Sequence, residues 1–139
     1  MVILDTNVLS ALIKDNPDPA IEGWLDGQPE VSVWTTAISI FEIRYGPAIM
    51  PVGRRQSLML AEFERTIEEI LEGRILVFDR LAAEQAALLM ARRKSAGWPI
   101  DLRDTMIGGI ALAQRATIAT RNIRHFADLD VPVVDPWSR

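Results

Sequence analysis

Short apolar runs alternate along this chain with longer segments in which apolar residues recur every three or four positions. A short, unbroken apolar run suits a strand that is buried on both faces, whereas the 3–4 spacing is typical of an amphipathic helix. Strands are expected at residues 2–4, 31–35, 75–78, 116–119 and 131–134. Because helical segments separate these strands, we predict an α/β fold in which helices cover both faces of a central parallel sheet of about five strands.

The helix boundaries are predicted from capping residues and breakers. Ser39 followed by Glu42 fits a capping box, and Gly46–Pro47 should end the helix that Ser39 opens. Gly108 and Gly109 permit close backbone packing in a later helix. Helices are expected at residues 8–13, 19–25, 39–46, 53–72, 81–96 and 123–127, and a further helix is expected to start near residue 102.

Composition narrows the class of protein. The 139 residues are 49% hydrophobic, which is enough for one domain spanning residues 1–139 and too much for a disordered chain. No apolar run approaches the roughly 18 residues of a membrane span. The absence of cysteine excludes thiolate metal sites and favours the cytoplasm, and a single histidine excludes multi-histidine zinc sites. The net charge of −4 argues against a protein that coats nucleic acid non-specifically.

Three acidic residues lie where strand ends meet helix starts. Asp5 directly follows the first strand, and Thr6 or Asn7 can cap a helix that begins at Val8. Glu42 and Asp104 are each expected in the first turn of a helix. Each acid also has a purely structural interpretation as a cap or a dipole-favoured charge.

Taken together, the three acids also suggest chemistry. Ligands of open α/β sheets bind at the carboxyl ends of the strands, so these side chains can share one pocket. Clustered carboxylates resist ionisation unless a cation is present, and a hard divalent ion such as Mg²⁺ prefers oxygen ligands. Such an ion activates water and neutralises charge on a phosphoryl oxygen, which indicates metal-assisted phosphodiester hydrolysis.

Five segments, in order along nearly the whole chain, resemble the motifs of the PIN-domain family. The last of them resembles the tail of the family's VapC branch, and the FitB-like subgroup is the most similar that we can name. The segments are residues 2–10 (VILDTNVLS), 38–46 (ISIFEIRYG), 104–111 (DTMIGGIA), 118–126 (IATRNIRHF) and 134–137 (VDPW).

The resemblance implies a three-layer PIN fold and a Mg²⁺- or Mn²⁺-dependent endoribonuclease that is the toxin of a type II toxin–antitoxin pair. It implies Asp5 and Asp104 as metal ligands and Glu42 as a further catalytic acid, with Thr120 and Asn122 ordering the site. Expected partners are RNA and a VapB-type antitoxin. The expected assembly is a homodimer that forms a heterotetramer or larger complex with the antitoxin, with no membrane association.

One position departs from the family pattern. Most members have an aspartate where this chain has His125, so one hard oxygen ligand is replaced by an imidazole. Imidazole suits Mn²⁺ better than Mg²⁺, and we therefore predict a one-metal site that prefers Mn²⁺. His125 can alternatively cap or pack at a helix end, or contact a phosphate when charged. Asp101 can replace the missing carboxylate, although a cap for the helix that follows it is its simpler role.

Basic and apolar residues suggest binding surfaces. Arg121 and Arg124 are adjacent in sequence to the proposed site, and we expect them to contact phosphate or antitoxin. The helices at 53–72 and 81–96 are the expected dimer or antitoxin surfaces because of their apolar content.

Two other functions stay open from the sequence. A catalytically degenerate PIN domain, suggested by His125, would bind antitoxin or RNA without cleaving it. A phosphoacceptor domain with Asp5 as nucleophile is disfavoured, since Asp5-Thr6-Asn7 lacks a second aspartate and no lysine follows a late strand.

Overall fold

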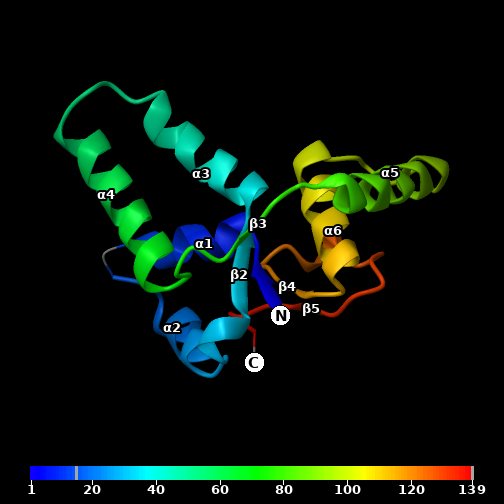
Figure 1. The fold of residues 1–139 in the computed structure, drawn as a ribbon, viewed down its shortest axis with the longest axis horizontal. Coiled ribbons are helices and arrows are strands. Elements are labelled where there is room, and N and C mark those ends of the chain that lie inside the picture. The colour runs from blue at the N-terminus through cyan, green and yellow to red at the C-terminus, as the bar shows by residue number, and fades with distance from the viewer. Residues whose placement is uncertain (15, 139) are drawn as a thin grey trace.

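The computed structural model describes residues 1–14 and 16–138 and contains a five-stranded parallel sheet with six α-helices (Figure 1). The strands are β1 Val2–Leu4, β2 Val33–Thr36, β3 Ile75–Leu76, β4 Thr117–Ala119 and β5 Val133–Val134. The helices are α1 Thr6–Ile13, α2 Pro19–Asp26, α3 Ala37–Ala48, α4 Arg54–Glu69, α5 Arg80–Ser95 and α6 Leu102–Gln114. Two short 3-10 helices lie at Glu30–Ser32 and Ile123–His125. The predicted α/β class and the sheet of about five parallel strands are confirmed.

The strand order β3-β2-β1-β4-β5 places β1 in the centre of the sheet. Val2 is in register with Val33 of β2 on one side and with Thr117 of β4 on the other. The chain first builds outward from β1 through β2 to β3 and then crosses to β4 and β5. The carboxyl ends of β1 and β4 therefore flank the point where the winding direction reverses, which is where ligands bind in open α/β sheets.

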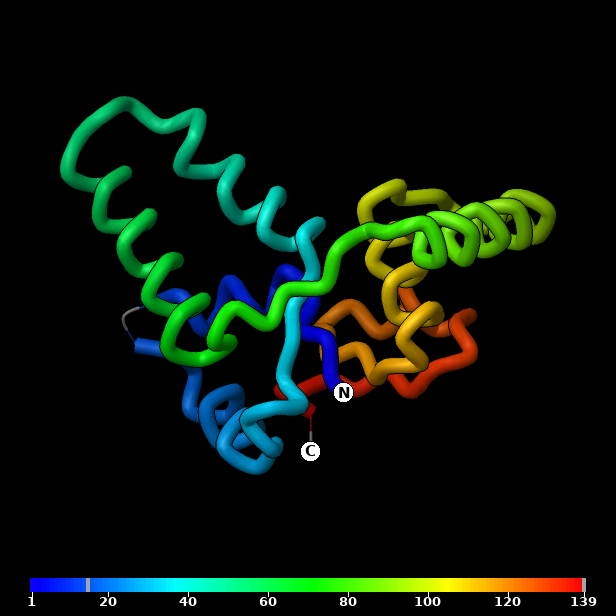
Figure 2. The backbone as a smooth tube through the Cα atoms, viewed as in Figure 1, coloured from blue at the N-terminus to red at the C-terminus, as the bar shows by residue number. Residues whose placement is uncertain are grey.

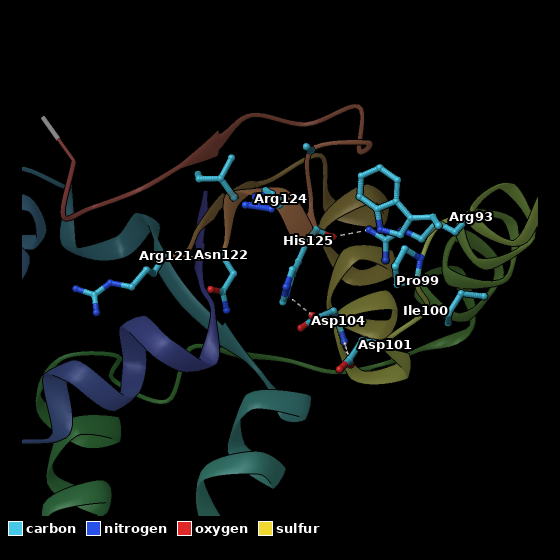
Figure 3. A pocket seen from close by; sticks show the side chains of 12 residues that line it. Arg93, Pro99, Ile100, Asp101, Asp104, Arg121, Asn122, Arg124 and His125 are labelled. Atoms are coloured by element: carbon cyan, nitrogen blue, oxygen red, sulfur yellow. Dashed lines mark hydrogen bonds and ion pairs between the residues drawn. The ribbon is translucent and has the colours of Figure 1, made fainter. Parts of the chain in front are cut away.

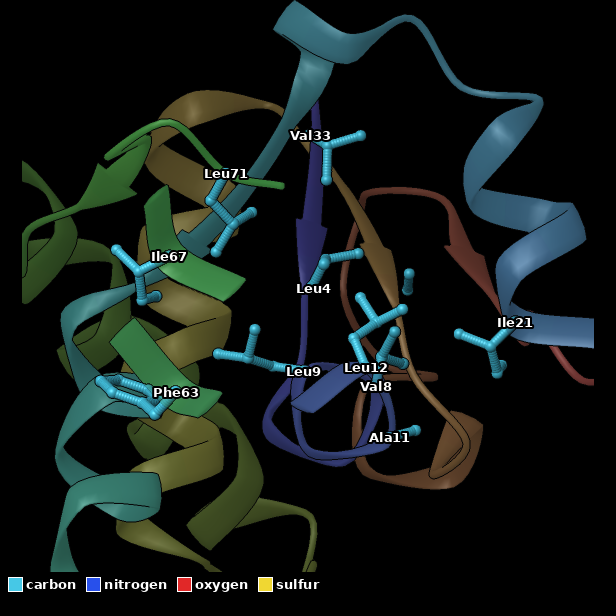
Figure 4. Packing of buried hydrophobic residues seen from close by; sticks show 11 residues of the cluster. Leu4, Val8, Leu9, Ala11, Leu12, Ile21, Val33, Phe63, Ile67 and Leu71 are labelled. Carbon is cyan, nitrogen blue, oxygen red and sulfur yellow. The ribbon is translucent and has the colours of Figure 1, made fainter. Parts of the chain in front are cut away.

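The two faces of the sheet have separate hydrophobic cores, because successive residues of a strand point to opposite faces. Leu4 belongs to a core that includes α1, α2 and α4, and Figure 4 shows Leu9, Phe63 and Leu71 in the same cluster. Ile3 belongs to the other core, which α5 and α6 cover with residues such as Leu89. The arrangement is the three-layer α/β/α fold that was predicted.

Helices α3 and α4 form an arm at one end of the molecule. Figure 2 follows the chain from β2 outward along α3 and back along α4 to β3, while α5 projects at the opposite end in this view. Helix α3 continues through the predicted stop, because Pro47 is accommodated within its last turn and the helix ends only at Ala48. Within the described residues, no helix is long and apolar enough to cross a membrane.

Two predicted helix starts and one predicted strand start differ from the structure. Helix α1 begins at Thr6, and its N-cap is Asp5 rather than Thr6 or Asn7. Helix α3 is capped by Thr36, whose hydroxyl accepts from the Ser39 amide at 3.2 Å, so Ser39 is not the cap. Thr36, the residue that ends β2, takes the capping role instead, although it is not followed by the glutamate of a capping box. The predicted strand at 31–35 begins as the 3-10 helix Glu30–Ser32, which leaves only Val33–Thr36 extended.

Other predicted elements are shorter than expected or agree closely. Strands β3 and β5 each keep only two residues, and the helix expected at 123–127 is a 3-10 helix ending at His125. The expected start of α6 at Leu102 with Asp101 as its cap is confirmed. Close packing at Gly109 is also confirmed, since a Cβ there would lie 2.6 Å from both the Ala82 carbonyl oxygen and the Ala86 Cβ.

Candidate functional site

Asp5 is a buried carboxylate at the carboxyl end of the central strand, with 3% of its surface exposed. Its Oδ1 accepts from the Thr6 amide at 2.8 Å, so the same side chain caps α1. Its Oδ2 accepts from the Thr120 hydroxyl at 2.8 Å and from the Asn7 amide nitrogen at 3.2 Å. These bonds fix the carboxylate in one orientation at the junction of β1 and β4.

Thr120 and Asn7 join the segments that follow β4 and β1. Thr120 is fully buried, and its Oγ1 also accepts from the Asn122 amide at 3.0 Å and from the Asn7 side chain at 3.2 Å. The Asn7 Oδ1 accepts from the Arg121 amide at 3.0 Å. Thr120 therefore lies directly against Asp5, whereas Asn122 contributes to the network through its backbone.

Glu42 reaches this region from the second turn of α3, one turn later than predicted. Its Oε1 accepts from the Thr6 hydroxyl at 2.9 Å, and the Ser39 hydroxyl lies 2.9 Å from the same Thr6 oxygen. Its Oε2 lies 3.6 Å from the Arg103 guanidinium of α6. Since Ser39 is buried against Thr6 rather than capping the helix, the α3 acid is linked to the residue beside Asp5.

Asp104 lies in the first turn of α6, as predicted, and contacts His125. Its Oδ2 lies 2.8 Å from the His125 Nδ1, while its amide donates to the Asp101 Oδ1 at 3.0 Å. The His125 side chain is 53% exposed, so it is directed at the acid rather than packed in the core (Figure 3). Asp101 caps the helix, which is its simpler predicted role.

Burial and the charges of neighbouring acids raise the pKa of Asp5 and of Asp104. Burial is the main cause of the raised pKa of Asp5, and the nearby charge of Asp104 adds to it, while bonds from Thr120 and Thr6 oppose it. Burial also raises the pKa of Asp104, with further contributions from the charges of Asp101 and Glu42, and His125 opposes the rise. A cation placed between the acids would stabilise their ionised forms.

The donor set fits a hard divalent ion that is held by few protein ligands. Among residues 1–14 and 16–138, no three Asp, Glu or His side chains lie close enough together to hold one ion. Mg²⁺ is commonly bound by one or two carboxylates and keeps several waters, so a pair of carboxylates without a third protein ligand is compatible with such an ion. Glu42, with one oxygen on Thr6 and the other near Arg103, stands outside this pair.

A cavity of about 1020 Å³ opens beside Asp104 and is lined by residues of α5, α6 and the segment after β4. Arg121, Asn122, Arg124 and His125 are on its wall, as are the apolar side chains of the loop between α5 and α6. The Arg121 side chain extends away from Asp104 (Figure 3), and its guanidinium lies 3.8 Å from the centre of the Trp137 ring.

Sequence reasoning missed several members of this site. Thr6 was considered only as a cap, yet its hydroxyl holds Glu42. Arg93, one of three consecutive basic residues in the last turn of α5, is 2% exposed and lines the cavity. The nearness of Thr6 to Asp5 in the sequence was an available signal. Nothing in the sequence indicated that one of the three consecutive basic residues at the end of α5 turns inward.

One protein family and several known proteins match this chain over nearly its full length. Residues 2–132 match the PIN domain family. This chain belongs to the PIN-domain family. It is 36% identical over 137 residues to VapC ribonuclease Y4jK of Sinorhizobium fredii. This match covers 99% of this chain and 98% of that protein. It is also 33% identical over 137 residues to toxin FitB of Neisseria gonorrhoeae, and this match covers 99% of both proteins.

The three-dimensional comparison agrees over the full length. The crystal structure of FitAcB from Neisseria gonorrhoeae contains a chain that superposes on this PIN domain with a TM-score of 0.88 at 32% identity, covering 100% of both chains. The predicted resemblance to PIN domains of the VapC and FitB type is therefore confirmed.

Proposed function

We propose that this PIN domain is a metal-dependent endoribonuclease and the toxin of a VapBC-type toxin–antitoxin pair. The observation that carries the proposal is the buried, fully oriented carboxylate of Asp5 at the switch point of the sheet, whose pKa is raised in part by Asp104. The names of two relatives, a VapC ribonuclease and toxin FitB, support RNA as the substrate and the toxin role. Cellular RNA as substrate places the site of action in the cytoplasm.

In this proposal Asp5 and Asp104 bind one Mg²⁺ or Mn²⁺ ion. When bound, such an ion makes water a better nucleophile at neutral pH and neutralises charge that builds on a phosphoryl oxygen. The bonds from Thr6, Asn7 and Thr120 hold the Asp5 carboxylate in one orientation, so this residue would bind an ion with little reorganisation. Glu42, held by the Thr6 hydroxyl, orients the attacking water.

Basic residues around the cavity provide the RNA-binding charge. Arg124 and Arg121 both line the cavity, and Arg103 lies 3.6 Å from Glu42. Guanidinium groups bind phosphate through fixed pairs of donors, so we assign Arg124 to the RNA backbone. Arg121 stacks on Trp137 and is assigned to the rim of the cavity, where RNA or antitoxin meets it.

The protein partner in this proposal is a VapB-type antitoxin, bound to a homodimer of this chain in a heterotetramer or larger assembly. Exposed apolar side chains mark the candidate surfaces. The predicted helices α4 and α5 carry some of them, and α3, which the sequence did not suggest, carries others. They include Leu58 on α4, Leu81 and Leu88 on α5, Phe41 and Tyr45 on α3, and Ile49 at the C-cap of α3.

Cleavage of total bacterial RNA by the antitoxin-free protein, with Mg²⁺, Mn²⁺ or EDTA, tests the proposal. We expect discrete cuts that require the metal and that disappear in Asp5→Asn. Asp18→Asn is the matched control, because Asp18 caps α2 through its Oδ1 as Asp5 caps α1 and lies outside the site. Loss of cleavage in both variants would show that a helix cap, rather than the metal ligand, explains the effect.

Metal binding is measured separately by thermal unfolding. A ligand at 100 times its dissociation constant stabilises a protein by about 2.7 kcal/mol, so saturating Mn²⁺ raises the Tm of the wild type and of Asp18→Asn but not of Asp5→Asn. A folded wild type that binds RNA without cleaving it in either metal would support the degenerate alternative. The contact of His125 with Asp104 favours that alternative, because it engages a carboxylate oxygen that the ion needs.

A further inference from the structure

Arg93 is a buried cation that the proposed chemistry does not use. It lies near the end of α5, and its side chain is 2% exposed, whereas its neighbours Arg92 and Lys94 are exposed. A buried guanidinium is costly unless its charge is paired and its donors are satisfied. The contacts that satisfy it therefore indicate what this residue does.

Arg93 forms a bidentate ion pair with Asp128. The Arg93 Nε donates to Oδ2 and Nη2 donates to Oδ1, both at 2.8 Å. The hydrogen bonds from Arg93 are the main reason that the pKa of Asp128 is lowered. Two parallel bonds fix the orientation of the guanidinium plane as well as its position.

The remaining donors of Arg93 reach the segments that carry the site. Nη2 donates to the backbone carbonyl of His125 at 2.6 Å, a bond that Figure 3 draws. Nη1 donates to the Thr105 hydroxyl at 3.2 Å, and that hydroxyl donates to the Asp101 carbonyl at 2.7 Å. Thr105 is adjacent to Asp104, so the Arg93 side chain is bonded both to the backbone of His125 and to the residue next to Asp104.

We infer that Arg93 is a positioning residue that holds the His125 segment at a fixed distance from the α6 turn bearing Asp104. The inference rests on the proposed function for its catalytic consequence, although not for its geometry. Besides the bonds of Arg93, the 3-10 helix ending at His125 is held to α6 by the exposed contact between the imidazole and Asp104 and by its buried C-cap residue Phe126, which packs in the same core as α6. Arg93 thereby sets the shape of the acidic end of the cavity that it lines.

Lysine cannot replace arginine in this arrangement. Lysine keeps the charge but presents one ammonium nitrogen, whereas the guanidinium presents five donors in a rigid plane. Arg93→Lys therefore retains the pairing with Asp128 and loses the simultaneous reach to the His125 carbonyl and Thr105. Arg74→Lys is a matched control, because Arg74 is also largely buried and donates to the carbonyls of Val33 at 2.7 Å and Ile70 at 3.1 Å.

The test uses the only histidine of the chain as a reporter. The imidazole signals of His125 are recorded by ¹H–¹³C NMR in the metal-free protein, and kcat and KM are measured for RNA with Mn²⁺. In Arg93→Lys we expect displaced or broadened imidazole signals and a kcat that falls about ten- to a hundredfold with KM little changed, since small misplacement of a site group costs this much. In Arg74→Lys we expect a comparable loss of thermal stability with wild-type imidazole signals and kcat.

Wild-type imidazole signals in folded Arg93→Lys would overturn the inference. If Arg93→Lys does not fold, Asp128→Asn takes its place, because it keeps Arg93 and weakens the pair that orients it, and the same two outcomes apply. A wild type that cleaves no RNA would refute the proposed nuclease, while the imidazole signals of the metal-free variants would still decide the role of Arg93.

Discussion

Replacing Thr120 with valine tests whether one hydroxyl stabilises the ionised form of Asp5. Thr120 is fully buried, and its Oγ1 donates to the Asp5 Oδ2 at 2.8 Å. Valine has a similar shape and no donor, so the carboxylate loses one of its charge-assisted bonds. Asp5 keeps its bonds from Thr6 and Asn7, whereas the Asn122 amide and the Asn7 side chain each lose an acceptor.

The expected loss of stability follows from the charge of the acceptor. A hydrogen bond to a charged group contributes about 1.5–3 kcal/mol, and a neutral one contributes about 1 kcal/mol. Thr35→Val is the matched control, because Thr35 is also fully buried and its hydroxyl donates to a neutral acceptor, the Leu4 carbonyl, at 3.0 Å. We therefore expect Thr120→Val to lose about 1–2 kcal/mol more than Thr35→Val at neutral pH.

The difference between the two variants should depend on pH. Burial raises the pKa of Asp5 above the 3.8 of a free aspartate, so the ionised group destabilises the metal-free fold as the pH rises from that value through the folded pKa. Removing the Thr120 bond raises this pKa further. The extra loss of folding stability in Thr120→Val is therefore small at acid pH and complete at neutral pH. The acid limb of the pH–activity profile should move to higher pH for the same reason.

Urea unfolding at several pH values, without metal, measures both variants. Thr120→Ser, which keeps the hydroxyl, should return most of the lost stability. Equal losses in Thr120→Val and Thr35→Val at neutral pH, or a difference that does not change with pH, would refute the reasoning that Thr120 acts through the charge of Asp5.

Two further predictions concern the metal preference and the packing of α6. His125→Asp replaces an imidazole next to Asp104 with a hard oxygen ligand, so activity with Mg²⁺ should rise relative to activity with Mn²⁺. If the wild type is equally active with both ions and the variant does not change this, the predicted one-metal site that prefers Mn²⁺ is wrong. Gly109→Ala places a Cβ 2.6 Å from the Ala82 carbonyl oxygen and should destabilise the fold by about 1–3 kcal/mol in the same urea assay. A Cβ at Gly46 would meet no atom within 4 Å, so Gly46→Ala should stabilise α3 by about 0.5–1 kcal/mol.

Most of the fold could be predicted because its strands and helices are locally consistent. The apolar run 2–4 and the alanine-rich segment 81–96 each favour one structure, and the chain adopts it. The boundaries that failed depend on neighbours in space. Thr36 and Ser39 both have side chains that can cap a helix. The Ser39 hydroxyl instead contacts the hydroxyl of Thr6 on α1, and Thr36 caps α3.

The site was predictable to the extent that its acids follow strands or open helices. Asp5 and Asp104 were placed by this rule, and the structure brings their charges close enough to interact. The surroundings were not predictable in the same way. An inward arginine such as Arg93 has the same sequence context as its exposed neighbours, and only the position of Asp128, on a different segment, decides that it is buried.

The bond between Thr120 and Asp5 joins positions 115 residues apart, and this separation has a consequence for how activity arises during folding. Closing so long a loop costs entropy before the contact forms, and non-local contacts of this kind form slowly. A chain in which β4 has not yet docked carries the acid but not the hydroxyl that orients it. Partly folded or truncated forms should therefore lack the proposed nuclease activity, which should be confined to molecules that have completed the sheet.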